Sequence, residues 1–142
     1  MSSKQIEAWV MVLGSVFISL WMVWKTLGAG VPATASGAAW EVLWAIGYVI
    51  VFNIVAMIAG VILVSIAQRE EVKDERADER DRFINARSMG TAYFVSSIGV
   101  LAVLVWLAFG LGPNLVPYAL FAVGMAAGAA SAVSKLVLYR IN

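Results

Sequence analysis

The residues best suited to chemistry lie in one charged stretch, KDERADERDRFINARS, at positions 73–88. With its flank from position 69, it holds seven of the nine Asp and Glu residues of a mostly apolar chain. Clustered carboxylates can bind a divalent cation, but a calcium loop places an oxygen ligand at every second residue and turns on a glycine. The spacing here matches no such loop. Cation binding is therefore an alternative interpretation, and we expect no metal site and no cofactor.

On a helical wheel, the charges between 69 and 87 separate into two faces. The carboxylates cover one half of the wheel and the basic residues form a stripe opposite, except for Arg82, which lies among the acids. Separated faces of this kind can recognise a partner with the opposite order of charge. The alternative is a solvated hairpin with intrahelical ion pairs such as Asp78–Arg82, each contributing ~0.2–0.5 kcal/mol. We predict a partner-binding surface of these residues: Asp74, Glu75, Arg76, Asp78, Glu79, Arg80, Asp81, Arg82 and Arg87.

Other chemistry is poorly represented in the chain. Cys and His are both absent, which removes disulfides, thiolate nucleophiles, the usual zinc sites and histidine proton transfer. No glycine-rich phosphate loop ends in Lys-Ser or Lys-Thr. A net charge of +1 offers no overall basic excess for direct nucleic-acid binding. We therefore expect a protein that is not an enzyme.

The elements that must position the charged stretch are membrane spans. The chain is 62% hydrophobic and 13% charged, whereas soluble domains carry about 25% charged residues. A helix needs roughly 20 apolar residues to cross a bilayer. Four stretches qualify, at about 6–27, 42–67, 91–111 and 115–138. The first is longer than the ~7–15-residue apolar region of a signal peptide, so we interpret it as a span. The predicted fold is all-α: a single domain, 1–142, forming a four-transmembrane-helix bundle.

The distribution of Lys and Arg predicts the orientation. Nine of the ten basic residues lie at the termini or in the segment 68–90, and only Lys25 lies on the opposite side. The positive-inside rule then places both termini and this segment in the cytoplasm. We predict a charged cytoplasmic helical hairpin over 68–90, with a turn near 74–80 and a helix from about 81. The expected location is the cytoplasmic (inner) membrane of a prokaryote.

The first and third spans share landmarks at a constant offset of 85 residues. Gly14 corresponds to Gly99 and Trp21 to Trp106, and Val31-Pro32 corresponds to the pair 116–117. Both spans would run in the same direction, so a parallel duplication of a helical hairpin is one interpretation. Chance similarity between two apolar helices is the other.

Small and polar residues within the spans indicate how the helices pack. Gly124 and Gly128 form a GxxxG pair, and Ser131 continues the small face, which allows close approach of another helix. That helix belongs to the same chain or to a second copy. Small residues occupy so much of the circumference of the fourth span that both contacts can coexist, and we expect a homo-dimer. Asn53 lies near the middle of the second span, where an amide needs a partner. We expect it to face the bundle and to bond Ser15, Ser19 or Ser96.

The segment Asp78-Glu79-Arg80-Asp81-Arg82-Phe83-Ile84, followed by Ala86-Arg87-Ser88, resembles the loop of small uncharacterised four-span prokaryotic membrane proteins. Those families carry a D-E-R-x-x-x-I segment between spans two and three, and some members are encoded beside helix-turn-helix regulators. The resemblance implies a cytosolic regulator as partner and supplies no catalytic residues. This chain differs by repeating the motif at 74–76.

Three functions are compatible with these features. The first is a non-enzymatic membrane interaction or regulatory protein whose charged hairpin docks a cytosolic partner. The second is a small dimeric transporter, or a membrane protein that binds lipid or a small molecule in a cavity near Asn53. The third is an accessory subunit of a larger membrane complex. In all three, membrane lipid surrounds the spans.

Overall fold

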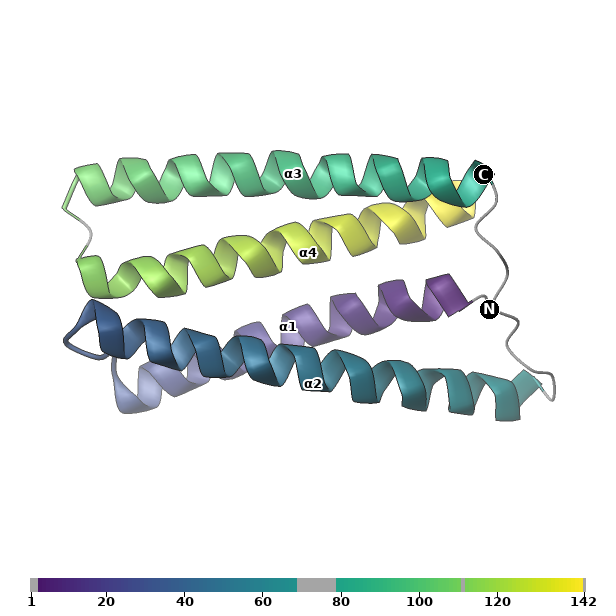
Figure 1. Ribbon diagram of the computed structural model, residues 1–142, viewed down its shortest axis with the longest axis horizontal. Helices are drawn as coiled ribbons and strands as arrows, with labels where there is room; N and C mark the ends of the chain where they lie inside the picture. Colours follow the sequence, from purple (N-terminus) through teal and green to yellow (C-terminus); the bar gives the residue numbers. More distant parts are fainter. Residues whose placement is uncertain (1–2, 69–78, 111, 142) are drawn as a thin grey trace.

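The computed structural model describes residues 3–68, 79–110 and 112–141, and these ranges are all-helical. The long helices are α1 (Ser3–Ala29), α2 (Ala35–Gln68), α3 (Glu79–Ala108) and α4 (Val116–Ile141). A short 3-10 helix, η1 (Pro113–Leu115), precedes α4 (Figure 1). The prediction of an all-α fold with four long helices is confirmed for the described residues.

All four long helices in the described part of the chain are long and apolar enough to cross a membrane, as predicted. The shortest, α4, has 26 residues and is therefore ~39 Å long, against a hydrocarbon core of ~30 Å. Large apolar side chains cover the surface: Trp24, Trp44 and Leu63 are all exposed. A soluble protein of this size rarely exposes so large a contiguous apolar surface, whereas lipid solvates it.

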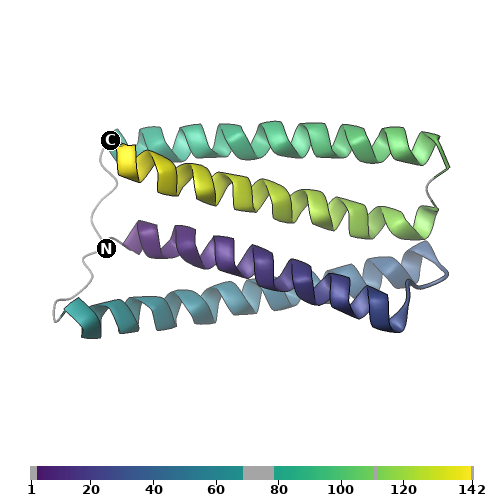
Figure 2. The same cartoon turned by 180° about the vertical axis from the view of Figure 1, so that it is seen from behind.

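The two ends of the bundle differ in what they contain. Both chain termini lie at one end, which we call the terminal end (Figures 1 and 2). The α1–α2 and α3–α4 connections lie at the other, which we call the turn end. Helix α3 begins at the terminal end with Glu79, so the described part of the charged stretch, from Glu79 to Ser88, lies toward that end.

Local signals set the helix boundaries at the turn end. Gly30 has a positive φ of 78°, and its N–H bonds the Thr26 carbonyl, which ends α1. Thr34 caps α2, because its hydroxyl accepts a hydrogen bond of 3.1 Å from the Gly37 N–H. Pro113 opens η1, where a missing N–H carries no cost.

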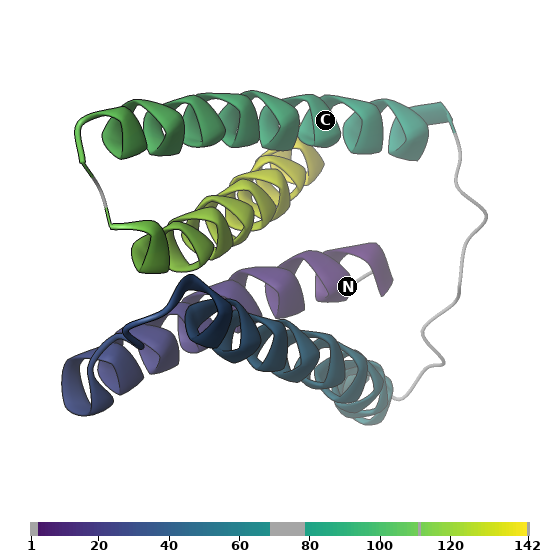
Figure 3. The same ribbon diagram turned by 60° about the vertical axis from the view of Figure 1, so that its left-hand side comes forward.

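Helix α4 is central to the packing. It packs against α3 and α1, while α2 packs chiefly against α1 and reaches α4 and η1 at the turn end. Figure 3 shows α2 diverging from α3 and α4 toward the C-terminal end of α2. The small residues Ala127, Ser131 and Ala132 of α4 are buried in these contacts. No residue in the most apolar stretch of α2 is buried, as expected for a helix that faces lipid along most of its circumference.

The predicted charged hairpin over 68–90 is described only from Glu79 onward, because residues 69–78 lie outside the described ranges. From Glu79 the chain forms one uninterrupted helix to Ala108, so the expected helix starting near 81 is continuous with the third span. The predicted span 91–111 extends past Ala108, where α3 ends.

The two glycines matched by the 85-residue offset occupy similar places in the two hairpins. A Cβ at Gly14 of α1 would lie 3.1 Å from the Phe52 ring of α2, and a Cβ at Gly99 of α3 would lie 2.5 Å from Val123 of α4. Each glycine therefore permits close approach of the helix that follows it. The two matched prolines lie in different places, because Pro32 lies between α1 and α2, whereas Pro117 lies inside α4.

Candidate functional site

The first turns of α3 form an exposed charged surface at the terminal end of the bundle. Ile84 and Ser88 are completely buried, which fixes the face of α3 that turns inward. Arg80, Arg82 and Arg87 lie on the remaining circumference, and all three are exposed. We call these three residues the arginine platform. Because the inward face is anchored, the platform is presented on a helix that is already folded and packed.

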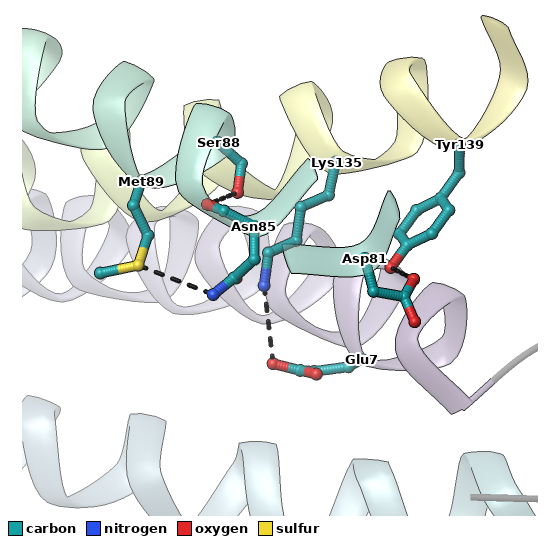
Figure 4. Close-up of polar contacts among 7 residues, drawn as sticks. All are labelled: Glu7, Asp81, Asn85, Ser88, Met89, Lys135 and Tyr139. Carbon is teal, nitrogen blue, oxygen red and sulfur yellow. Dashed lines mark hydrogen bonds and ion pairs between the residues drawn. The ribbon is translucent and has the colours of Figure 1, made fainter. Parts of the chain in front are cut away.

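Contacts between helices hold the start of α3 in place (Figure 4). Tyr139 of α4 donates a hydrogen bond of 2.9 Å from its Oη to Asp81 Oδ1. About three turns further along α3, the Thr91 hydroxyl donates to Ser134 Oγ of α4 at 3.5 Å. These bonds add to the burial of Ile84, so α3 and α4 are joined from the first turn of α3.

An ion pair joins α4 to α1 at the same end. Lys135 Nζ lies 3.9 Å from Glu7 Oε1 (Figure 4). The Lys135 side chain is 17% exposed and that of Glu7 is 50% exposed, so water screens the pair and its contribution is ~0–1 kcal/mol. The pair therefore marks the relative position of α1 and α4 at the terminal end and adds little stability.

The structure separates the nine predicted partner-binding residues into three groups. Glu79 and the arginine platform are exposed, and Arg87 lies over the Phe83 ring at 6.0 Å from its centroid. Asp81 is half-buried and faces Tyr139, so it belongs to the packed side of α3. The rest fall outside the described residues: Asp74, Glu75, Arg76 and Asp78.

Sequence reasoning did not select Tyr139, Lys135 or Glu7. A signal for the inward face of α3 was present, because Asp81, Ile84 and Ser88 follow the spacing i, i+3, i+7 of one helix face. The helical wheel considered only charges and therefore grouped Asp81 with the exposed acids. Its partner is 58 residues away in sequence, and no local pattern indicates that contact.

A second polar cluster lies at the turn end. Lys25 Nζ is 3.3 Å from Glu41 Oε1, and the Tyr118 hydroxyl donates to Glu41 Oε2, so one carboxylate joins α1, α2 and α4. The ammonium of Lys25 also lies 5.8 Å from the centre of the Trp21 ring. In addition, the Asn114 side-chain amide donates a 2.9 Å hydrogen bond to the Pro32 carbonyl, which ties the two connections together. This cluster therefore fastens three helices at the turn end.

The predicted packing residues occupy different environments. Ser131 is buried and Gly128 faces Ser15 of α1, with 4.0 Å between that hydroxyl and a Cβ placed on the glycine. Gly124 is exposed and has nothing within 4 Å of such a Cβ. Among the described residues the GxxxG pair is therefore divided between a helix contact at Gly128 and the exposed surface at Gly124.

Asn53 does not bond the serines expected from the sequence. Its Nδ2 donates to the Val49 carbonyl of its own helix at 2.8 Å, and its Oδ1 is buried without a hydrogen-bond partner in the described structure. That oxygen faces Gly14 of α1, at 3.4 Å from a Cβ placed there. Ser15 instead donates to the Met11 carbonyl at 2.7 Å. Both polar groups satisfy a donor locally, as short polar side chains in helices often do.

Metal-ligand clusters and surface grooves are the remaining features that bear on a candidate site. Within the described ranges, no three acidic side chains lie close enough together to hold a metal ion. Two grooves on the described surface have linings that are mostly apolar. Comparison of the chain with protein-family models, with curated proteins and with solved structures found no match.

Proposed function

We propose that this chain is a prokaryotic cytoplasmic-membrane protein that docks a cytosolic partner at its terminal end. The positive-inside rule supports the orientation, since nine of the ten Lys and Arg residues lie near the termini or in the segment 68–90 of the sequence, and only Lys25 lies at the turn end. In this orientation the arginine platform lies in the cytoplasm. The four helices serve as the anchor.

The observation that carries the proposal is the length of α3 together with its buried face. Its 30 residues are ~45 Å long, which exceeds the ~30 Å hydrocarbon core by ~15 Å. The excess belongs to the terminal end, because the last turns of α3 are apolar and include Trp106, whereas the first turns carry the arginines. Arg80 and Arg82 then stand in water beyond the headgroups, on a helix held by Ile84 and Tyr139.

The chemistry of the platform favours an acidic protein surface as the partner. Arg presents five donors in a planar fork that matches carboxylates. Because α3 is already ordered, binding does not have to supply the entropy of folding this helix. The resemblance noted above favours a helix-turn-helix regulator as the cytosolic partner, with no direct contact between this chain and nucleic acid. A second copy of the chain as a membrane-embedded partner is compatible with this arrangement.

Photocrosslinking in living cells tests the proposal. A photoreactive residue at Glu79 should form an adduct with one cytosolic protein, and Arg80→Ala with Arg82→Ala should remove that adduct. The matched control is Arg140→Ala, which removes an exposed basic residue from the end of α4. Equal adduct yields in the platform variant and the control, or adducts to lipid alone, would contradict the proposal.

The two alternative functions predict different results in the same experiment. An accessory subunit should crosslink to another integral membrane protein along α2 or α3. A transporter should need a polar route between the two ends, and its activity should be insensitive to Arg80→Ala and Arg82→Ala. Of the three functions, only docking of a cytosolic partner depends on the arginine platform at the start of α3.

A further inference from the structure

A groove of about 340 Å³ lies at the turn-end half of the bundle, outside the charged surface. Its walls come from α1 and α3, and its floor comes from α4. Helices α1 and α3 both pack on α4. The floor between them is low because Ala119 and Ala122 have small side chains. The volume falls within the ~300–1,000 Å³ range of ligand pockets.

The lining of the groove offers few hydrogen-bond partners to water. A buried water needs two to four polar partners. The Thr26 hydroxyl directs its one proton toward the carbonyls of Met22 and Val23, at 3.0 and 2.9 Å, and the Tyr118 hydroxyl donates to Glu41. Neither proton is available to a water molecule, and each oxygen can only accept. Ser19 is the remaining hydroxyl on the lining. The groove is therefore suited to hydrocarbon.

The direction and depth of the groove indicate which hydrocarbon. It follows α1 from Thr26 to Ser19, and it follows the chain from Leu115 at the end of η1 to Ala122 in α4. It therefore runs along the helix axes for ~10 Å. Lipid chains in a bilayer run in that direction, and ~10 Å is within one leaflet of a ~30 Å core. Trp106 lies on the rim, and indole rings favour the depth of the headgroups.

We propose that this groove binds one acyl chain of a phospholipid from the leaflet at the turn end, as a lipid retained by the protein. The chain enters beside Trp106 and lies over Ala119 and Ala122. The Tyr118 ring separates it from the Lys25–Glu41 pair. The proposal rests on the membrane-spanning part of the proposed function and is independent of partner docking.

Photolabelling of the full chain in liposomes tests the proposal. The probe is a phosphatidylethanolamine with a diazirine on one acyl chain, and adducts are mapped by mass spectrometry of peptides. Adducts at Met22 and Tyr118 are expected to resist competition by excess unlabelled lipid, whereas adducts on the exposed α2 surface at Ile58 are expected to be competed away. Ala122→Phe should fill the floor and reduce the groove adducts severalfold while the Ile58 adducts remain.

Leu120→Phe is the matched control, because it introduces the same side chain at an exposed position on another face of α4. It should leave the groove adducts unchanged. If Ala122→Phe fails to fold, Ala119→Leu serves the same purpose with a smaller side chain. Groove adducts that are competed away as easily as those at Ile58, or that persist in a folded Ala122→Phe or Ala119→Leu protein, would overturn the proposal.

Two other results would also overturn it, with different meanings. A groove protected from the probe in a dimeric sample would assign it to a second copy. If adducts are absent both from the groove and from α2, the membrane span itself is refuted. Loss of partner crosslinking at the terminal end, in contrast, has no bearing on the groove.

Discussion

Tyr139, near the end of α4, donates a 2.9 Å hydrogen bond to Asp81, the third residue of α3. The bond connects residues 58 positions apart and closes the terminal end of the α3–α4 pair. It assigns Asp81 to the packed face of α3 and leaves the three arginines of the platform outside. The described half of the charged stretch is thus part of the bundle rather than an independent hairpin.

Tyr139→Phe should weaken the start of α3 without unfolding the bundle. Hydrogen bonds to charged groups contribute ~1.5–3 kcal/mol, and partial exposure reduces this to ~1 kcal/mol. Thermal unfolding in detergent should show a small decrease in midpoint, and amide exchange at residues 81–84 should accelerate. Tyr93→Phe is the control, because Tyr93 is 77% exposed. Equal exchange in both variants would show that the bond does not order α3.

Gly99→Ala should destabilise the α3–α4 pair. An added Cβ would lie 2.5 Å from Val123 Cγ1, and a β-branched side chain has few alternative rotamers. Overpacking of this kind costs ~1–3 kcal/mol, which outweighs the ~1 kcal/mol gain in helix propensity. Gly124→Ala is the matched control and should be neutral or stabilising, because its Cβ meets open space. Unfolding midpoints measured in one detergent compare the two, and a midpoint for Gly99→Ala at or above the wild-type value would refute the close contact.

The turn-end cluster should draw its stability from Tyr118 rather than from Lys25. The Lys25 and Glu41 side chains are 33% and 28% exposed, so their coupling should be only ~0–1 kcal/mol. The Tyr118–Glu41 hydrogen bond is to a charged acceptor and should couple by ~1.5–3 kcal/mol. Two double-mutant cycles, Tyr118→Phe or Lys25→Met each combined with Glu41→Gln, measure both couplings. The reverse order of magnitudes would contradict this ranking.

Replacement of Asn53 by Leu should be neutral or stabilising. The Asn53 Oδ1 is buried without a partner, and removing an unsatisfied buried acceptor recovers part of a ~1–3 kcal/mol desolvation cost. Asn53→Asp is the contrasting variant and should be strongly destabilising, because it places a charge at membrane depth. A lower unfolding midpoint for Asn53→Leu would contradict this prediction and would show that the amide oxygen accepts a stabilising hydrogen bond.

The length and apolarity of the four spans were predictable from sequence, because lipid requires ~20 apolar residues in a helix whatever the packing. The rotation of each helix about its axis was not predictable from charge alone. Burial of Ile84 and Ser88 turns Asp81 inward, and only contacts with α4 decide that burial. Asn53 was expected to need a distant donor, but the Val49 carbonyl of its own helix lies closer. Likewise, the GxxxG pair does not reveal that only Gly128 faces α1.

The most direct measurement of the central claim is single-cysteine labelling, which the absence of native Cys makes unambiguous. Glu79→Cys reports the terminal end and Ala33→Cys the turn end, and both positions are exposed. A membrane-impermeant maleimide should label Ala33→Cys in intact spheroplasts and Glu79→Cys only in inverted vesicles. Labelling of Glu79→Cys in intact spheroplasts, or of both cysteines from the same side, would contradict a water-exposed arginine platform in the cytoplasm.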